Sequence, residues 1–164
     1  MLRVSFPVLS LMLLLGASLQ NAAVAQDRFK PSADGLEVTD SKTGLIWRRC
    51  PEGMAFKGKT CIGQAVFVSQ VEATGRAKAA SAGNVRWRLP QLKELATIAA
   101  PREASEGVAA IDPVAFPATP AGRFWTSSTS GHGYFSFVGF TDGGAGENAR
   151  TSPGAVRLVR GGGE

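Results

Sequence analysis

"SQVEATGRAKAASAGNVRWRLPQLKELATIAA", residues 69–100, contains two helix starts in one continuous stretch. Ser69 and Glu72 have the S-x-x-E spacing of a capping box, in which the hydroxyl and the carboxylate accept hydrogen bonds from free backbone N–H groups. Small apolar side chains then recur at helical spacing, at Ala73, Ala77 and Ala80. The first half of the stretch therefore predicts a helix that packs closely against a sheet.

The second helix start lies at Pro90, whose ring presets the backbone for a first helical turn. Apolar side chains follow on one face, at Leu92, Leu95, Ala96 and Ile98. This face is typical of a helix that packs on the core.

The segments on either side of residues 69–100 have the pattern of strands. Apolar positions in residues 36–40 and 45–47 flank a turn, and residues 123–130 and 134–140 flank a Ser/Gly turn. Phe135 and Phe137 are predicted to face one side of the sheet, opposite to Tyr134, Ser136, Val138 and Phe140. A last strand is expected in residues 155–161. Two helices between groups of strands predict an α+β fold with an antiparallel sheet, since buried parallel strands alternating with helices are not seen.

The only two cysteines, Cys50 and Cys61, lie at the ends of "CPEGMAFKGKTC". A zinc site needs more ligands than these thiols and the single His132, and a redox pair usually has the C-x-x-C spacing. A disulfide that closes a polar, glycine-containing loop or hairpin is therefore favoured.

The N-terminal segment indicates export. Arg3 precedes a short apolar run, and the small residues that end at Ala25 fit a signal-peptidase site, which favours a cleaved signal peptide over residues 1–25 rather than an uncleaved anchor. Residues 26–164 are then expected to form one domain, with no transmembrane segment. The whole chain has a net charge of +5, and removal of Arg3 leaves +4. This balance supports solubility and does not indicate nucleic acid binding.

Six strings in order resemble one family: "TGLIWRRCPEG", "KTCIGQA", "WRLPQLKEL", "IDPVAFPATP", "FWTSST" and "VRLVRGG". Together they span about residues 34–162 and resemble the domain at the C-terminus of bacterial collagen-like adhesins. The resemblance implies a C-type-lectin-like fold, related to formylglycine-generating enzymes, and binding of sulfated polysaccharides. This chain lacks the collagen-like stalk, so trimerisation is not carried over. It also has Gln91 where the family often has Thr, so the hydroxyl cap of the second helix is missing.

Catalysis and metal binding are the weaker hypotheses. His132 beside a run of serines fits no nucleophile motif, and the glycines around it suggest a flexible hairpin tip. Asp142 and Glu147 suit a solvated turn better than a glycosidase pair. Calcium on Asp142, Glu147 and Asn148 stays a minor alternative, because their spacing is not that of an EF-hand. We expect neither an enzyme nor a cofactor.

The predicted binding surface consists of two loops, residues 126–134 and 142–150. The candidate ligand contacts in them are Ser128, His132, Tyr134, Glu147, Asn148 and Arg150. A basic patch for acidic groups is also predicted, at Arg48, Arg49, Lys57 and Lys59. Arg157 and Arg160, by contrast, are expected to pair with buried acids.

The sequence thus predicts an exported, non-catalytic binding domain for a surface glycan, with acidic glycans favoured by the basic patch. A protein-interaction module, or an accessory subunit of a cell-envelope complex, is the alternative, and an envelope enzyme acting on a wall or glycan substrate ranks third. Periplasmic and cell-surface locations remain open, as do the oligomeric state and the identity of the ligand.

Overall fold

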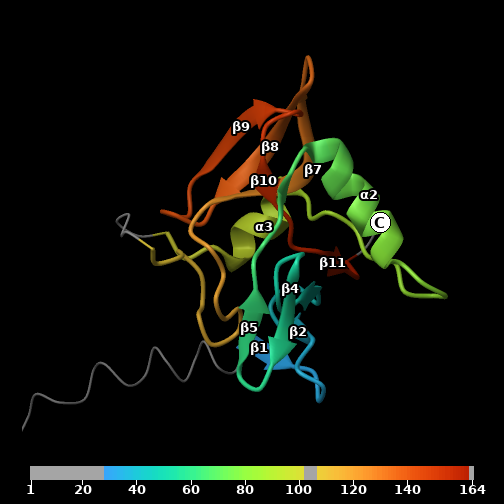
Figure 1. Ribbon diagram of the computed structural model, residues 1–164, viewed down its shortest axis with the longest axis vertical. Coiled ribbons are helices and arrows are strands. Elements are labelled where there is room, and N and C mark those ends of the chain that lie inside the picture. Colours follow the sequence, from blue (N-terminus) through green and yellow to red (C-terminus); the bar gives the residue numbers. More distant parts are fainter. Residues whose placement is uncertain (1–27, 102–106, 163–164) are drawn as a thin grey trace, which may run out of the picture.

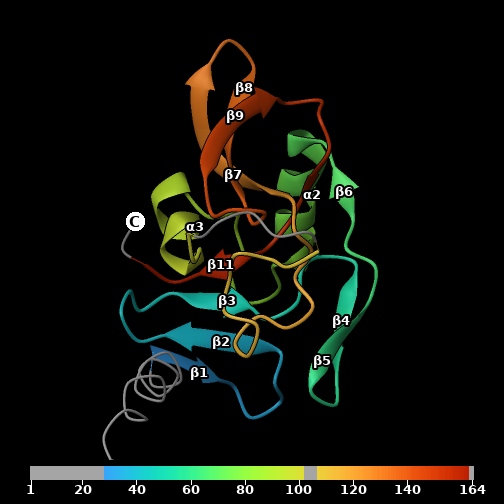
Figure 2. The ribbon, with the colours of Figure 1, turned by 90° about the vertical axis from the view of Figure 1, so that its left-hand side faces the viewer.

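Eleven strands and two helices make up the part of the chain that the computed structural model describes, residues 28–101 and 107–162. The strands form a four-stranded, a five-stranded and a two-stranded sheet. The four-stranded sheet lies at one end of the molecule and the largest sheet at the other, with the helices between them (Figures 1 and 2).

The four-stranded sheet joins the two ends of the described chain. Its order is β1 (Phe29–Pro31), β2 (Glu37–Asp40), β3 (Ile46–Arg48) and β11 (Val159–Arg160). All three pairings are antiparallel, and Val159 lies opposite Trp47. The strands expected in residues 36–40 and 45–47 are therefore confirmed as β2 and β3.

The five-stranded sheet is curled and contains the longest strands. Its order is β6 (Phe67–Val68), β10 (Gly154–Ala155), β7 (Arg123–Gly131), β8 (Tyr134–Gly139) and β9 (Ala145–Ala149). The strands predicted in residues 123–130 and 134–140 are confirmed as β7 and β8. The expected last strand is instead split between two sheets, as β10 and β11, and β10 runs parallel to β7.

Both predicted helices are present, as α2 (Gln70–Ala80) and α3 (Leu92–Ile98). The Ser69 side chain accepts a hydrogen bond from the Glu72 N–H at 3.2 Å, as the capping box requires. Ala73 and Ala77 are buried, and in α3 the buried side chains are Leu95 and Ile98.

The buried side chains form two clusters on opposite faces of the five-stranded sheet. One contains Leu95 of α3 with Val138 and Phe140. The other contains the alanines of α2 with Trp125, and Phe135 and Phe137 pack against it. The two faces predicted for residues 134–140 are therefore confirmed.

The α+β, C-type-lectin-like prediction is wrong. Strands dominate the structure, and its largest sheet is a curled half-barrel rather than a small sheet flanked by two helices in the manner of a C-type lectin. The sequence pattern did not reveal this architecture because three of its strands, β6, β10 and β11, have only two residues each. Such strands are too short for alternation to show, and they form because packing brings their backbones beside a partner.

The predicted disulfide is confirmed. The Sγ atoms of Cys50 and Cys61 are 2.05 Å apart. The bond ties β5 (Thr60–Gly63) to the end of β3, and β5 pairs with β4 (Met54–Lys57) in an antiparallel hairpin. This hairpin is the two-stranded sheet, and the disulfide is a second covalent link, besides the chain itself, between it and the rest of the fold.

Arg157 and Arg160 differ in their partners. Arg160 Nη2 lies 2.6 Å from a Glu37 carboxylate oxygen, and both side chains are partly exposed. Arg157 is fully buried, and its guanidinium donates to the Arg48 carbonyl oxygen at 2.8 Å and to Thr119 Oγ1 at 2.6 Å. No acid forms an ion pair with Arg157 within the described ranges, so only Arg160 pairs with an acid, and that acid is partly exposed rather than buried as expected. Burial lowers the pKa of Arg157 to about 9.

Candidate functional site

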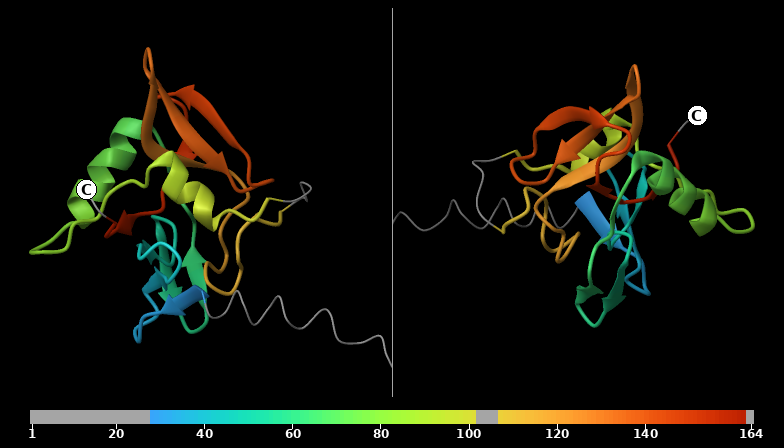
Figure 3. Two further views of the ribbon diagram at one scale, coloured as in Figure 1. Left: turned by 180° about the vertical axis from the view of Figure 1, so that it is seen from behind. Right: turned by 45° about the horizontal axis from the view of Figure 1, so that its top comes forward.

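A groove of about 720 Å³ with several charged side chains lies beside α2. One wall is the C-terminal half of α2, and the other is the extended segment of residues 86–91. Strand β7 and the glycines after β11 close its ends, and Figure 3 shows β11 running out beside α2. The lining residues that carry the argument are Lys78, Arg86, Trp87, Arg88, Gln91 and Ser127.

Small side chains and a strand pairing hold the two walls in place. Ala73 and Ala77 allow Trp87 to pack against α2, and all three belong to one core cluster. Arg88 is pinned to β11 by two backbone hydrogen bonds with Val159, of 2.9 and 3.0 Å. The groove is therefore a rigid feature of the fold, as a binding site on a scaffold requires.

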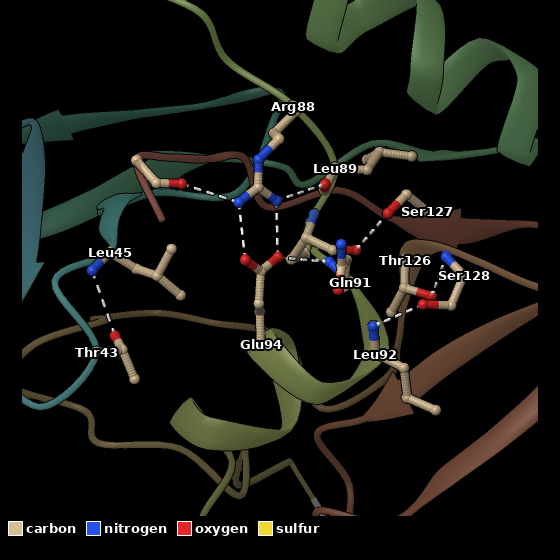
Figure 4. Close-up of polar contacts among 12 residues, drawn as sticks. Thr43, Leu45, Arg88, Leu89, Gln91, Leu92, Glu94, Thr126, Ser127 and Ser128 are labelled. Atoms are coloured by element: carbon tan, nitrogen blue, oxygen red, sulfur yellow. Dashed lines mark hydrogen bonds and ion pairs between the residues drawn. The ribbon is translucent and has the colours of Figure 1, made fainter. Parts of the chain in front are cut away.

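Glu94 fixes the Arg88 side chain at the floor of the groove (Figure 4). Its two carboxylate oxygens each lie 2.7 Å from a guanidinium nitrogen, and the Gln91 N–H donates to it at 2.7 Å. Burial on its own raises the pKa of Glu94, but the hydrogen bonds from Arg88 and Gln91 outweigh it and hold the pKa below its ordinary value. The charge of Arg88 is thus neutralised in place.

Two further cations keep their charge available to a ligand. Lys78, in the last turn of α2, and Arg86 are both exposed, and no ion pair joins either to an acid in the part of the chain that the structure describes. No carboxylate residue is among the described residues that line the groove. The groove therefore has a net positive charge.

Two further guanidinium groups pack on Trp87. The guanidinium carbons of Arg48 and Arg160 lie 4.7 and 5.4 Å from the centre of its ring. Trp87 is only 5% exposed, so little of its ring is open to a ligand. Its main role is to hold the wall.

The four residues of the predicted basic patch do not form one surface. Arg48 packs on Trp87, whereas Arg49 stacks on Phe56 at 4.4 Å and donates to the carbonyl oxygens of Val114 and Ala115. Lys57 and Lys59 are exposed at the end of the β4–β5 hairpin, where Lys59 and Arg49 line a hollow of about 610 Å³. Burial lowers the pKa of Arg49.

The predicted ligand contacts in the two loops also do not form one surface. His132, Tyr134 and Arg150 lie together at the tip of the β7–β8 hairpin, since the Arg150 N–H donates to the Gly133 carbonyl oxygen at 2.9 Å. Glu147 lies on the same face of the sheet as Tyr134, because their cross-strand partners are Ser136 and Ala149. The tip is thus exposed, with an aromatic ring and charges of both signs.

Asn148 and Ser128 serve the fold in this structure. Asn148 Oδ1 accepts hydrogen bonds from the Ala149 N–H and the Ser152 hydroxyl, both at 3.0 Å. Ser128 Oγ accepts from the Leu92 N–H at 2.9 Å, at the start of α3 (Figure 4). A serine of β7 thus supplies the hydroxyl that the sequence lacks at Gln91.

The groove residues Lys78, Arg86 and Arg88 were not among the predicted contacts. The R-W-R alternation of residues 86–88 was the signal that could have found them, since it places two cations on one side of an extended segment and an aromatic ring on the other.

Residues 36–160 match the family described as the Lcl C-terminal domain. The chain belongs to this family. The family expected from the sequence is thereby confirmed, and no curated protein matches the chain. As an Lcl C-terminal domain it is an adhesin-like domain, so the family supports binding rather than catalysis.

Neither helix in residues 28–101 and 107–162 is long and apolar enough to cross a membrane. In the same residues, no three His, Cys, Asp or Glu side chains come together as metal ligands would. The oxygens proposed for calcium are dispersed: Asp142 accepts from the Gly144 N–H within its turn, and Glu147 lies on β9.

Proposed function

We propose that this adhesin-like domain binds a segment of an acidic glycan in the groove beside α2. The observation that carries the proposal is the pair of exposed cations, Lys78 and Arg86, on opposite walls of a groove without a lining carboxylate. Ammonium and guanidinium groups form charge-assisted hydrogen bonds with sulfate and carboxylate.

The size and rigidity of the groove support the same ligand class. A volume of about 720 Å³ suits a short saccharide segment rather than a single ion. Gln91 and Ser127, also on its lining, offer neutral polar groups to sugar hydroxyls. Because Arg88 is held by Glu94, it shapes the floor and is not free to follow the ligand.

The proposal includes export. The Cys50–Cys61 bond fits a domain that works outside the reducing cytoplasm. Residues 1–25 would then be removed as a signal peptide, leaving residues 26–164 as the mature chain. Mass measurement of the protein recovered from the periplasm or the medium of an expressing bacterium tests this step, and a mass that includes residues 1–25 would contradict it.

Binding of three glycans tests the groove: heparin, which is sulfated, hyaluronan, which has carboxylates only, and neutral dextran. The Lys78→Ala/Arg86→Ala variant should bind heparin about tenfold more weakly, since two solvent-screened charge contacts together contribute about 1.4 kcal/mol. Dextran should not bind. Unchanged unfolding temperatures would show that the variants are folded.

The matched control is Lys57→Ala/Lys59→Ala, which removes the same number of charges from the β4–β5 hairpin. Affinity lost equally in both double variants would indicate general attraction to a cationic protein. Loss only in the hairpin variant would move the site to the predicted basic patch. Loss only on Tyr134→Ala would move it to the hairpin tip, which remains the second candidate surface.

A further inference from the structure

Strand β9 is an open edge of the five-stranded sheet. It follows β8 at the end of the strand order, and Figure 1 shows it on the outer side of that sheet. Edge strands present unpaired N–H and C=O groups to any partner that can add a strand. The edge is therefore a place where a partner backbone could bind.

The hydrogen bonds at the two ends of β9 show which of its backbone groups are free. The Gly144 carbonyl oxygen accepts from the Gly139 N–H at 2.7 Å, and the Arg150 N–H donates to the Gly133 carbonyl oxygen at 2.9 Å. Because alternate residues of a strand point their backbone groups to the same side, residues 144, 146, 148 and 150 face β8. Ala145, Glu147 and Ala149 face outward.

Of these outward residues, Ala149 is already satisfied. Its N–H donates to Asn148 Oδ1 at 3.0 Å, and its carbonyl oxygen accepts from the Ser152 N–H at 2.9 Å. Ala145 and Glu147 are exposed, and within the described ranges no backbone hydrogen bond engages their outward N–H and C=O groups. The N–H and C=O groups of Ala145 and Glu147 are therefore free to pair with the backbone of an added strand.

In the four- and five-stranded sheets, the other outer strands are protected in ways that β9 is not. Strand β1 carries Lys30 and Pro31, which discourage pairing, and β6 and β11 have two residues each. Strand β9 has five residues without Pro or Lys, and its register with β8 is regular. Of the outer strands in these two sheets, β9 therefore offers the longest edge without a Pro or Lys.

The two faces of β9 indicate what the partner strand carries. Glu147 is exposed on one face. On the other, the Phe137 ring lies over Gly146, since a Cβ on that glycine would be 2.7 Å from the ring. A partner residue opposite Glu147 would meet a negative charge, and its neighbour opposite Gly146 would meet an aromatic ring.

We infer that β9 accepts an extended segment of another protein, which adds as a sixth strand. The segment carries a basic residue opposite Glu147, next to an apolar residue that packs on Phe137. A second copy of this chain fits less well, because a two-fold pairing centred on Glu147 would place two carboxylates opposite each other. The inference concerns a surface other than the groove and does not depend on glycan binding.

Selection from a displayed library of random linear peptides on the periplasmically expressed protein tests the inference. The enriched peptides should share a pattern in which a basic residue is directly followed or preceded by an apolar residue. Glu147→Pro removes an outward N–H and, after the permissive Gly146, leaves the β8 pairing intact. It should weaken the best peptide at least about tenfold, whereas Glu147→Thr, which keeps the N–H, should reduce mainly the preference for a basic residue.

Hydrogen exchange of the unmodified protein gives an independent measurement. The Ala145 and Glu147 amides should become protected when the best peptide is added, and the amides of β1 should not change. The inference is overturned if no peptide is enriched, if enriched peptides bind Glu147→Pro equally, or if both amides stay unprotected. A dimer that protects these amides without peptide would also overturn it, because the occupant would then be a second copy.

Discussion

Ser128→Ala separates a structural role from a binding role at one predicted contact residue. In the structure the Ser128 hydroxyl accepts a hydrogen bond from the Leu92 N–H at 2.9 Å, while its own N–H donates to Thr126 Oγ1 at 3.3 Å. Leu92 is the first residue of α3, and its N–H has no partner within the helix. Alanine would leave this half-buried donor unpaired.

The expected loss is about 1 kcal/mol of unfolding free energy, the usual effect of removing a hydroxyl cap. For a domain of this length it corresponds to about 4 °C in unfolding temperature. Thermal unfolding followed by circular dichroism measures it. Ser130→Ala is the matched control, because Ser130 is an exposed serine on the same strand. Its unfolding temperature should stay within about 1 °C of the unmodified protein.

Heparin affinity gives the second readout. If Ser128 serves only to cap α3, the heparin affinity of Ser128→Ala should stay within about twofold of that of the unmodified protein. Gln91→Thr in the Ser128→Ala background should recover part of the lost stability, since it places a hydroxyl at the N-cap itself. Lost affinity without lost stability would refute the capping argument and return Ser128 to the list of ligand contacts.

Three further predictions concern buried charge, acid and the disulfide. Thr119→Val should cost about 2 kcal/mol in urea unfolding, because it leaves an Arg157 donor buried without its acceptor; a loss below about 0.5 kcal/mol would contradict this. Desolvation by burial raises the pKa of Asp40, but hydrogen bonds from Arg28, the Lys42 N–H and Thr43 outweigh it and lower the pKa below 3.8. The contribution of Asp40 to the free energy of unfolding should thus be complete above pH 3.8 and fall as the pH drops through the lower folded pKa. If the free energy of unfolding of Asp40→Asn depends on acid pH as steeply as that of the unmodified protein, this would count against it. Cys50→Ser/Cys61→Ser should lose about 3 kcal/mol, measured by urea unfolding, and reductant should affect only the unmodified protein; equal sensitivity of both proteins would point to another cause.

Local chemistry explains which elements were predictable. The Ser69 cap and the alanine spacing of α2 act within one helix, and the two cysteines lie in one short loop. The alternation of β8 extends over six residues, so both of its faces could be assigned from the pattern. In each case the residues that decide the structure are neighbours in sequence, and a pattern of neighbours is visible in a single chain.

The groove and the cap of α3 were not predictable in this way. Lys78 and Arg86 become opposite walls only because Trp87 packs on α2 and Arg88 pairs with β11. The cap of α3 comes from Ser128, on a strand that follows the helix in sequence. The predicted basic patch is divided for a related reason, because the Arg48 side chain packs on Trp87 and the Arg49 side chain packs on Phe56.

The sequence by itself determined both helices, the main strands, the disulfide and the family, because each of these is encoded by residues close together in the chain or by the order of short strings. The tertiary structure alone decided the three-sheet architecture, the burial of Arg157 and the groove. Two-residue strands and a cation held by carbonyl oxygens have no local pattern. They exist because folding places distant backbone groups within hydrogen-bonding distance, where an unpaired buried group would be costly.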